Sequence, residues 1–269
     1  WNLIKKADLI LLALCLIATA FGAALIFSAT RYDASLHSSF LKQLAAAAGG
    51  LVCYFVLTHL DLNLIMTKWK WLLALSVLFI LMLLTPLGVA DDTGNRSWLS
   101  IPGIPFNLQP AEFVKLSFIL LLARQLVWLR ESRRGVSSPP SVCFLGAHLL
   151  FMGGLIFAVS SDLGMVTIYC LIFAGMTWAG RVSKWWFVAV GGGLAAGAAA
   201  LWNLVLPNTS LWTDYRIMRI RVLFDHSLDP LDRGYQQTRS LLAIGSGQLT
   251  GQGYLHGTQT QSTSAEALP

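Results

Sequence analysis

Charged residues are scarce in this 269-residue chain. Asp, Glu, Lys and Arg make up 12% of it, against about 25% in an average soluble domain, whereas apolar residues make up 55%. The mean hydropathy is +0.63. This composition excludes an ordinary soluble domain. It predicts a membrane protein, because several apolar runs reach the roughly 20 residues that a helix needs to cross a bilayer.

Residues that usually carry soluble enzyme chemistry are also few. The four cysteines lie singly in apolar runs, which predicts packing positions instead of a disulfide framework or a metal site. The five histidines show no metal-ligand spacing, and no Ser-His-Asp order, HExxH or P-loop pattern is present. The net charge of +6 is typical of cytoplasmic loops in a polytopic protein, so we predict no nucleic-acid partner.

Seven apolar segments follow one another along the chain. The predicted fold class is an all-α polytopic membrane protein with about seven transmembrane helices, followed by a long outward-facing loop with an amphipathic helix. We assign residues 1–206 to the helical bundle and residues 207–269 to an extracytoplasmic segment that forms an incomplete C-terminal part of the same domain. The spans are predicted at about residues 9–28, 44–60, 71–90, 111–129, 142–159, 163–179 and 185–206.

The basic residues predict the orientation in the membrane. In the seven-span arrangement the opposite short loops carry only Arg31, Lys42 and Arg96, so by the positive-inside rule the richer side is cytoplasmic. The N-terminus then lies in the cytoplasm, and residues 91–108 and 207–269 face outward. The basic residues on the cytoplasmic side are Lys5, Lys6, Lys68, Lys70, Arg124, Arg130, Arg133, Arg134, Arg181 and Lys184.

The fourth span begins with a charged turn. Pro110 suits the first turn of a helix, because its missing N–H would be unpaired there. Glu112 and Lys115 are three residues apart and share a helix face. Such charges are costly in a membrane unless they are paired. They indicate either a structural ion pair that ties two helix ends or a functional site.

Other polar residues are predicted to converge with this turn on the outward side. The preceding loop carries Arg96 and Trp98 and leads into Gln109, and Asp162 lies at the outer junction of spans five and six. Asp162 by itself fits an N-cap of the sixth helix. Its alternative role is at the mouth of an outward-facing site.

The segment after residue 206 combines arginines with apolar residues and then glycines. Arg216, Arg219 and Arg221 alternate with apolar residues, as in an interfacial helix that binds anionic lipid headgroups. Residues 243–253 are dense in glycine, which favours turns but also lets backbone N–H groups approach an anion. Together these features predict a phosphate or diphosphate ligand, because guanidinium groups bind such anions bidentately.

In this order and between spans, the motifs resemble the SEDS family of polytopic cell-wall glycosyltransferases, the group of RodA, FtsW and SpoVE. The C-terminal motifs are more similar to RodA than to FtsW. The matching stretches are Asn-Arg-Ser-Trp-Leu at 95–99, Gln-Pro-Ala-Glu at 109–112 with Lys115, Asp-Leu-Gly at 162–164, Asp-Pro at 229–230, Gly-Tyr-Gln at 234–236, the glycine-rich 243–253, and Gly-Thr-Gln-Thr-Gln at 257–261.

The resemblance implies an activity. Members of the family polymerise lipid II, an undecaprenyl diphosphate-linked precursor, into glycan strands on the outer face of the bacterial cytoplasmic membrane. They act with a class B penicillin-binding protein, which cross-links the strands. A RodA-like member serves cell-wall elongation, and a divalent cation, Mg²⁺ or Mn²⁺, often supports activity in the family.

The chain departs from the family pattern at several points. Ser160 and Ser161 stand where the family usually has Gln-Pro, and Ser97 separates Arg96 from Trp98. The catalytic Asp of the family lies in a His-Thr-Asp segment shortly after the stretch that corresponds to 257–261, and the family has ten spans. Because this sequence starts at Trp1 and ends at Pro269, we expect it to correspond to the N-terminal two-thirds of such an enzyme, without the catalytic Asp.

These considerations give a site hypothesis. Lys115, Arg96 and the arginines between 216 and 221 would line the diphosphate end of lipid II, Glu112 would hold Lys115, and Asp162 would order the outer mouth or a metal. A flippase for a lipid-linked precursor and a noncatalytic scaffold of the cell-wall synthesis complex are the alternatives. The substrate-site candidates are Arg96, Trp98, Gln109, Glu112, Lys115, Asp162, Arg216, Arg219, Arg221, Asp229, Tyr235 and Gln236.

Overall fold

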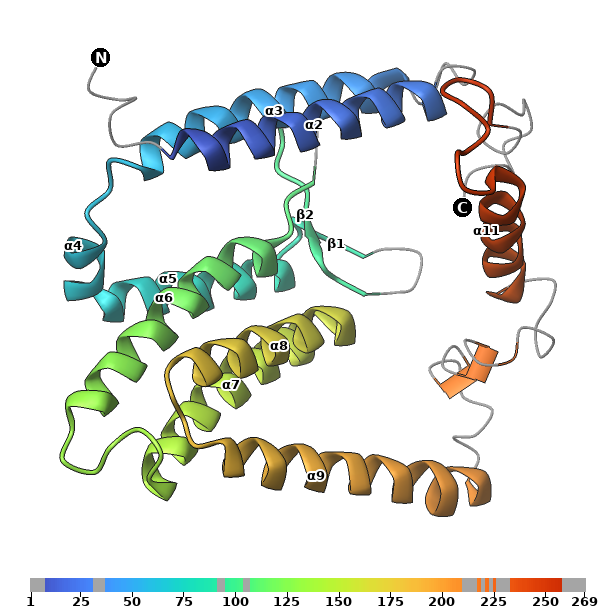
Figure 1. Cartoon of the computed structure of the whole chain (residues 1–269). Helices are drawn as coiled ribbons and strands as arrows, with labels where there is room; N and C mark the ends of the chain where they lie inside the picture. Colours follow the sequence, from blue (N-terminus) through green and yellow to red (C-terminus); the bar gives the residue numbers. More distant parts are fainter. Residues whose placement is uncertain are drawn as a thin grey trace. The chain divides into compact units, whose positions relative to one another are not determined.

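The chain is an all-α polytopic membrane protein, as its sequence predicts (Figure 1). The computed structural model describes residues 8–30, 37–90, 95–103, 107–209, 217–218, 221–222, 225 and 233–257. Long helices stand at all of the predicted spans within this part. They are α2 (Leu9–Thr30), α3 (His37–Leu57), α5 (Trp69–Leu81), α6 (Pro110–Glu131), α7 (Pro139–Ser160), α8 (Leu163–Ala179) and α9 (Lys184–Ala200).

Shorter elements connect and extend these helices. A π-helical turn and a 3-10 turn continue the chain after α9, and two short strands form a hairpin ahead of α6. The shorter elements are α4 (Leu62–Thr67), η2 (Met82–Leu84), β1 (Gly88–Val89), β2 (Trp98–Leu99), η3 (Leu201–Val205), η4 (Leu206–Asn208) and α11 (Arg233–Gly247).

The chain forms two compact units, described separately below. Unit 1 comprises Trp1–Leu60 with Ala198–Pro269, and unit 2 comprises Asp61–Gly197. The predicted division at residue 206 concerns the membrane topology and stays a prediction.

An antiparallel helix hairpin begins unit 1. The side chain of Asp8 accepts hydrogen bonds from the backbone N–H groups of Ile10 and Leu11, both at 3.0 Å. These N–H groups have no backbone partner within the first turn of α2, so Asp8 caps the helix. At the same end, the hydroxyl of Tyr54 on α3 donates to the carbonyl of Asp8 at 2.8 Å. At the other end, the Phe27 and Phe40 rings pack edge to face with centroids 5.4 Å apart.

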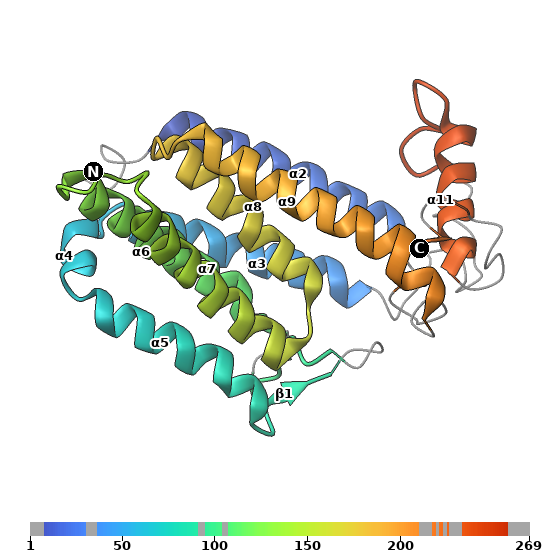
Figure 2. The same ribbon diagram turned by 90° about the horizontal axis from the view of Figure 1, so that it is seen from below.

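Helix α6 is at the centre of unit 2, where it contacts α5, α7 and α8 (Figure 2). A buried stripe runs along it at helical spacing, so one face of α6 meets its neighbours along its whole length. In a bilayer such contacts are stabilised by close packing instead of removal from water. The stripe consists of Val114, Phe118, Leu122, Leu126 and Leu129, and it packs on Ile80, Leu145, Met152, Ile156, Met165 and Tyr169.

The outer faces of the long helices suit a lipid environment. Ile10 on α2 is 77% exposed and Leu150 on α7 is 75% exposed, which is the pattern of side chains that face acyl chains. In the described part, four helical stretches have the length and apolarity of membrane spans: Leu9–Thr30, Ser38–Leu57, Pro139–Ser160 and Lys184–Leu204. Helix α6 is long enough but carries the charges of Glu112, Lys115, Arg124, Arg130 and Glu131.

At two of the predicted spans the bounds of the helix differ from those of the span. The third span, predicted at 71–90, ends its α-helix at Leu81, because Thr85 takes the extended conformation that a following proline favours. The second span, predicted to begin at residue 44, belongs to a helix that starts at His37, because its first polar turns are also helical.

Candidate functional site

A small β-hairpin fixes the segment that carries Arg96 and Trp98. Strand β1 pairs antiparallel with β2, with Val89 opposite Trp98. The far side of Leu99 forms a bridge with Leu108, in which the N–H of each residue donates to the carbonyl of the other at 2.7 and 2.9 Å. Leu99 is fully buried, so it anchors the hairpin beside the residues that lead into α6. Trp98 is 37% exposed and Arg96 is exposed, so both side chains are available to a ligand.

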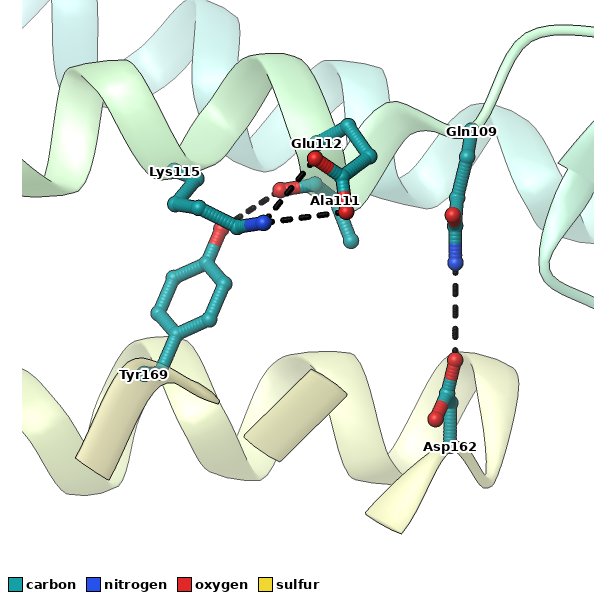
Figure 3. Close-up of polar contacts among 6 residues, drawn as sticks. All are labelled: Gln109, Ala111, Glu112, Lys115, Asp162 and Tyr169. Carbon is teal, nitrogen blue, oxygen red and sulfur yellow. Dashed lines mark hydrogen bonds and ion pairs between the residues drawn. The ribbon is translucent and has the colours of Figure 1, made fainter. Parts of the chain in front are cut away.

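Glu112 and Lys115 form an ion pair in the first turns of α6 (Figure 3). The ammonium of Lys115 donates to both carboxylate oxygens of Glu112, each at 2.9 Å. The pair lies within one helix and therefore does not tie two helix ends, which was one of its two predicted roles. The Lys115 side chain is only 17% exposed, whereas that of Glu112 is 51% exposed. Glu112 therefore holds the ammonium of a mostly buried lysine side chain near the start of the helix.

Asp162 both caps α8 and contacts α6. Its Oδ1 accepts a hydrogen bond from the backbone N–H of Met165 at 2.9 Å, which is the N-cap role that its position predicts. Its Oδ2 accepts from Nε2 of Gln109, the N-cap residue of α6, at 3.4 Å (Figure 3). Ser161, in the left-handed conformation with φ of 55°, makes the tight turn that brings Asp162 to this place.

Tyr169 is a site component that the sequence analysis missed. It is fully buried, and its hydroxyl donates to the carbonyl of Ala111 at 2.9 Å, while Phe118 packs on its ring with centroids 4.9 Å apart. The sequence feature that could have revealed Tyr169 is its position seven residues after Asp162, because that spacing places both residues on the same face of an otherwise apolar span. Tyr169 thereby fixes the first turn of α6 against α8.

Charged side chains and two helix N-termini come together at this end of unit 2. The contacts of Gln109 with Asp162 and of Ala111 with Tyr169 show that α6 and α8 start side by side and run in the same direction. Two helix N-termini, each with a partial positive charge, thus lie side by side, and the Lys115 ammonium lies further along α6, on the side where Tyr169 of α8 approaches (Figure 3). The Glu112 carboxylate holds the ammonium of Lys115, and the Asp162 carboxylate caps α8.

In unit 1, only part of the glycine-rich segment is a loop. Residues 243–247 form the last turns of α11, so the turns that the glycine density favours over 243–253 begin only after Gly247. Gly251 and Gly253 have φ of 75° and 93°, which favour glycine. The hydroxyl of Tyr254 donates to the carbonyl of Ala24 at 3.0 Å and holds the loop on α2.

A cavity of about 750 Å³ lies between α2 and this glycine segment. Phe21 and Leu25 line it from α2, and Gly251 and Gly253 line it from the loop. Its described lining contains no Lys, Arg, Asp or Glu, so the cation that the diphosphate hypothesis requires is not among these residues.

The remaining predicted residues fall in unit 1 or outside the described part. Tyr235 is half-buried, with the guanidinium carbon of Arg239 5.1 Å from its ring centroid. Arg221 is half-buried in a short helical stretch, and the backbone of Gln236 belongs to α11. Their convergence with Lys115 stays a prediction. Arg216, Arg219, Asp229 and the side chain of Gln236 lie outside the described residues, as does most of the predicted amphipathic helix.

The described residues do not make a complete site for a divalent cation. No group of three His, Cys, Asp or Glu side chains comes together in the part of the chain that the structure covers. Near the start of α6, Glu112 is engaged by Lys115 and Asp162 is engaged as a helix cap. Mg²⁺ prefers several oxygen ligands in octahedral geometry, so this set does not fit it. We therefore derive no step through a metal.

Comparison with known proteins identifies the family. The sequence model of the FtsW, RodA and SpoVE family, described as cell cycle protein, matches residues 6–267. The chain belongs to this family. The resemblance inferred from the motifs is thus confirmed. As a member with these apolar helices, the chain is a multi-pass protein of the bacterial inner membrane.

Relatives within the FtsW/RodA/SpoVE family match most of this chain. The peptidoglycan glycosyltransferase MrdB of Escherichia coli strain K12 is 31% identical over 261 residues, which cover 94% of this chain and 62% of MrdB. Stage V sporulation protein E of Bacillus subtilis strain 168 is 29% identical over 260 residues, covering 91% of this chain and 65% of that protein. The chain therefore spans slightly less than two-thirds of the length of these relatives.

A solved structure shares the fold. It is described as "Structural coordination of polymerization and crosslinking by a peptidoglycan synthase complex". The TM-score is 0.60 and the sequence identity is 25%, and the match covers 85% of this chain and 63% of the solved chain.

Proposed function

We propose that this protein is a peptidoglycan glycosyltransferase that polymerises lipid II into glycan strands for cell-wall elongation. The observation that carries the proposal is the Lys115 ammonium, which both oxygens of Glu112 hold in the first turns of α6, in the helix pair whose N-termini are joined by Gln109 and Asp162. The relative MrdB, named as a peptidoglycan glycosyltransferase, supports the same reaction.

The chemistry needs a cation where a diphosphate leaves. In the reaction, a sugar hydroxyl attacks the anomeric carbon of the lipid-linked sugar, the bond from that carbon to the diphosphate oxygen breaks, and a base takes the hydroxyl proton. Negative charge accumulates on the departing diphosphate, and preorganised positive groups stabilise it. Lys115 and the two helix N-termini supply such groups. Arg96, on the adjoining hairpin, would add a guanidinium.

The proposal includes an orientation and a partner. With the N-terminus in the cytoplasm, the start of α6 faces outward, where polymerisation takes place. The partner would be a class B penicillin-binding protein that cross-links the product. Support for it comes from the solved synthase complex, whose description joins polymerization with crosslinking.

Purified protein, expressed from its complete reading frame and supplied with fluorescent lipid II in detergent, tests the function. We expect glycan polymer without any vesicle, and a loss of at least about tenfold with Lys115→Met, since removing one stabilising group commonly costs 10²–10³ in rate. Translocation of lipid II across vesicles without polymer formation would instead establish the flippase. Polymer only in the presence of a partner synthase, unchanged by Lys115→Met, would establish the scaffold.

A further inference from the structure

A second cavity lies in unit 2, and its lining residues take no part in the proposed reaction. It has a volume of about 260 Å³ and is bounded by α5, α6 and α7. Arg124 lines the cavity and lies twelve residues after Glu112 on α6. At a rise of 1.5 Å per residue, the two residues are roughly 18 Å apart along the helix. The cavity therefore lies toward the opposite, basic end of α6. The lining residues used below are Trp69, Arg124, Gln125, Trp128, Phe144 and His148.

An arginine held by an aromatic ring forms the polar side of the cavity. The guanidinium carbon of Arg124 lies over the Trp69 ring, 5.4 Å from its centroid. Stacking of this kind uses one face of the guanidinium and leaves the N–H groups at its edge free to donate. The sequence analysis placed Arg124 on the cytoplasmic side, and it lies inside α6, seven residues before Glu131.

Positive charge at this place is uncompensated within the described part of the chain. The ammonium of Lys70 lies 5.8 Å from the centroid of the same Trp69 ring. Among the described residues, no carboxylate lies within ion-pair distance of Arg124 or Lys70. Two cations around one ring at the end of a membrane helix favour an anionic ligand, because basic pockets between spans bind anionic lipid headgroups.

The other walls of the cavity are apolar except for two polar side chains, Gln125 and His148. The rings of Trp128 on α6 and Phe144 on α7 pack edge to face with centroids 6.0 Å apart. His148 is 8% exposed, and its Nδ1 lies 2.9 Å from Oε1 of Gln125. Its Nε2 is buried and has no hydrogen-bond partner among the described residues. An aromatic wall beside two cations matches a ligand with an anionic head and an apolar chain.

We propose that this cavity binds an anionic glycerophospholipid from the leaflet on the basic side of the protein. The phosphodiester accepts hydrogen bonds from Arg124 and attracts Lys70, and the beginning of one acyl chain packs on Trp128 and Phe144. The volume is slightly below the roughly 300–1,000 Å³ of sites for drug-sized ligands, which suits a headgroup with a short length of chain. It is too small for the disaccharide and peptide of lipid II together with its carrier.

Lipid titration of the delipidated protein in detergent, expressed from its complete reading frame and read out by native mass spectrometry, tests the proposal. Phosphatidylglycerol and phosphatidylcholine are the two ligands. We expect phosphatidylglycerol to bind at least about fivefold more tightly, and Arg124→Gln to remove about fivefold of that affinity, as expected for about 1 kcal/mol per basic residue. Binding of phosphatidylcholine should not change.

Arg130→Gln is the matched control, because Arg130 is exposed in the last turn of the same helix and does not line the cavity. We expect a change of less than twofold. An equal loss with Arg130→Gln and Arg124→Gln, or no preference for phosphatidylglycerol, would overturn the proposal in favour of general attraction to a basic surface.

A photoactivatable phosphatidylglycerol on the unmodified chain gives a second test that does not depend on how a variant folds. Labelling should concentrate on the peptides that contain Trp128 and Phe144. Labelling spread evenly over the spans, or confined to unit 1, would also overturn the proposal.

Discussion

Gln109 and Asp162, the N-cap residues of α6 and α8, are joined by a hydrogen bond of 3.4 Å from Nε2 of Gln109 to Oδ2 of Asp162. Residues 53 positions apart in the sequence thus hold two helix N-termini together. The second oxygen of Asp162 caps its own helix. One carboxylate therefore sets both the start of α8 and its contact with α6, and its two roles can be separated by substitution.

Asp162→Ala removes the cap and the link to Gln109, so we expect the free energy of unfolding to fall by about 1 kcal/mol, as for other lost N-caps. Asp162→Asn retains an amide oxygen that can cap, so its stability should stay within about 0.5 kcal/mol of the native value. Unfolding in mixed micelles measures both. If Asn destabilises as much as Ala, the cap is not the stabilising contact.

Glu112→Gln tests the role of the ion pair. The Glu112 side chain is 51% exposed, and pairs three residues apart on a helix contribute only about 0.2–0.5 kcal/mol, so the variant should unfold almost like the native protein. Polymerisation of lipid II should nevertheless fall at least about tenfold, because the Lys115 ammonium loses the carboxylate that positions it. Native turnover in a folded Glu112→Gln protein would contradict a positioning role for Glu112.

Tyr169→Phe removes one hydroxyl from a fully buried side chain without leaving a large void. The lost hydrogen bond to the Ala111 carbonyl should lower the free energy of unfolding by about 0.5–1.5 kcal/mol. Tyr169→Ala should lower it by about 3–5 kcal/mol, because the ring that packs on Phe118 is also lost. Equal effects of Phe and Ala would show that the hydroxyl, and not the ring, holds α8 on α6.

Two glycines of unit 1 give a matched pair of substitutions. Gly253→Ala places a Cβ on a residue with φ of 93°, and the nearest atom, on His256, is 3.9 Å from that Cβ. The expected cost of about 1–2 kcal/mol therefore comes from the backbone conformation alone. Gly245→Ala lies inside α11 with open space around the new Cβ, so it should stabilise by about 0.5–1 kcal/mol. The same unfolding assay measures both, and a destabilising Gly245→Ala would argue against helix at 243–247.

Hydropathy and caps predicted the spans best where both signals agree. The sixth span was predicted at 163–179 and α8 has these bounds, because Asp162 starts it and Gly180 follows its last residue. At the third span the α-helix is shorter than the predicted span, because apolar residues continue past the helix and Pro86 favours an extended Thr85. Gly88 confirms the turn, since a Cβ there would overlap the carbonyl oxygen of Leu83.

The charged residues of the site could be predicted from the sequence, because a charge in an apolar helix stands out. Glu112, Lys115 and Asp162 were found because each is costly in a membrane without a partner. Tyr169 was missed because a tyrosine in a span is usually a packing residue, and only the Ala111 carbonyl across the helix interface gives its hydroxyl a role. The end of α11 was mistaken for a loop, because glycine tolerates several backbone conformations and its density alone does not distinguish them.

Equilibrium binding of undecaprenyl diphosphate to detergent-solubilised protein tests the central claim, that Lys115 and two helix N-termini hold a diphosphate. Lys115→Met should weaken binding by about tenfold or more, as expected for a charge-assisted contact of about 1.5–3 kcal/mol. Lys115→Arg should retain most of the affinity, and undecaprenol, which lacks the diphosphate, should bind all three proteins equally. Unchanged affinity of the Lys115→Met protein for the diphosphate would contradict the account.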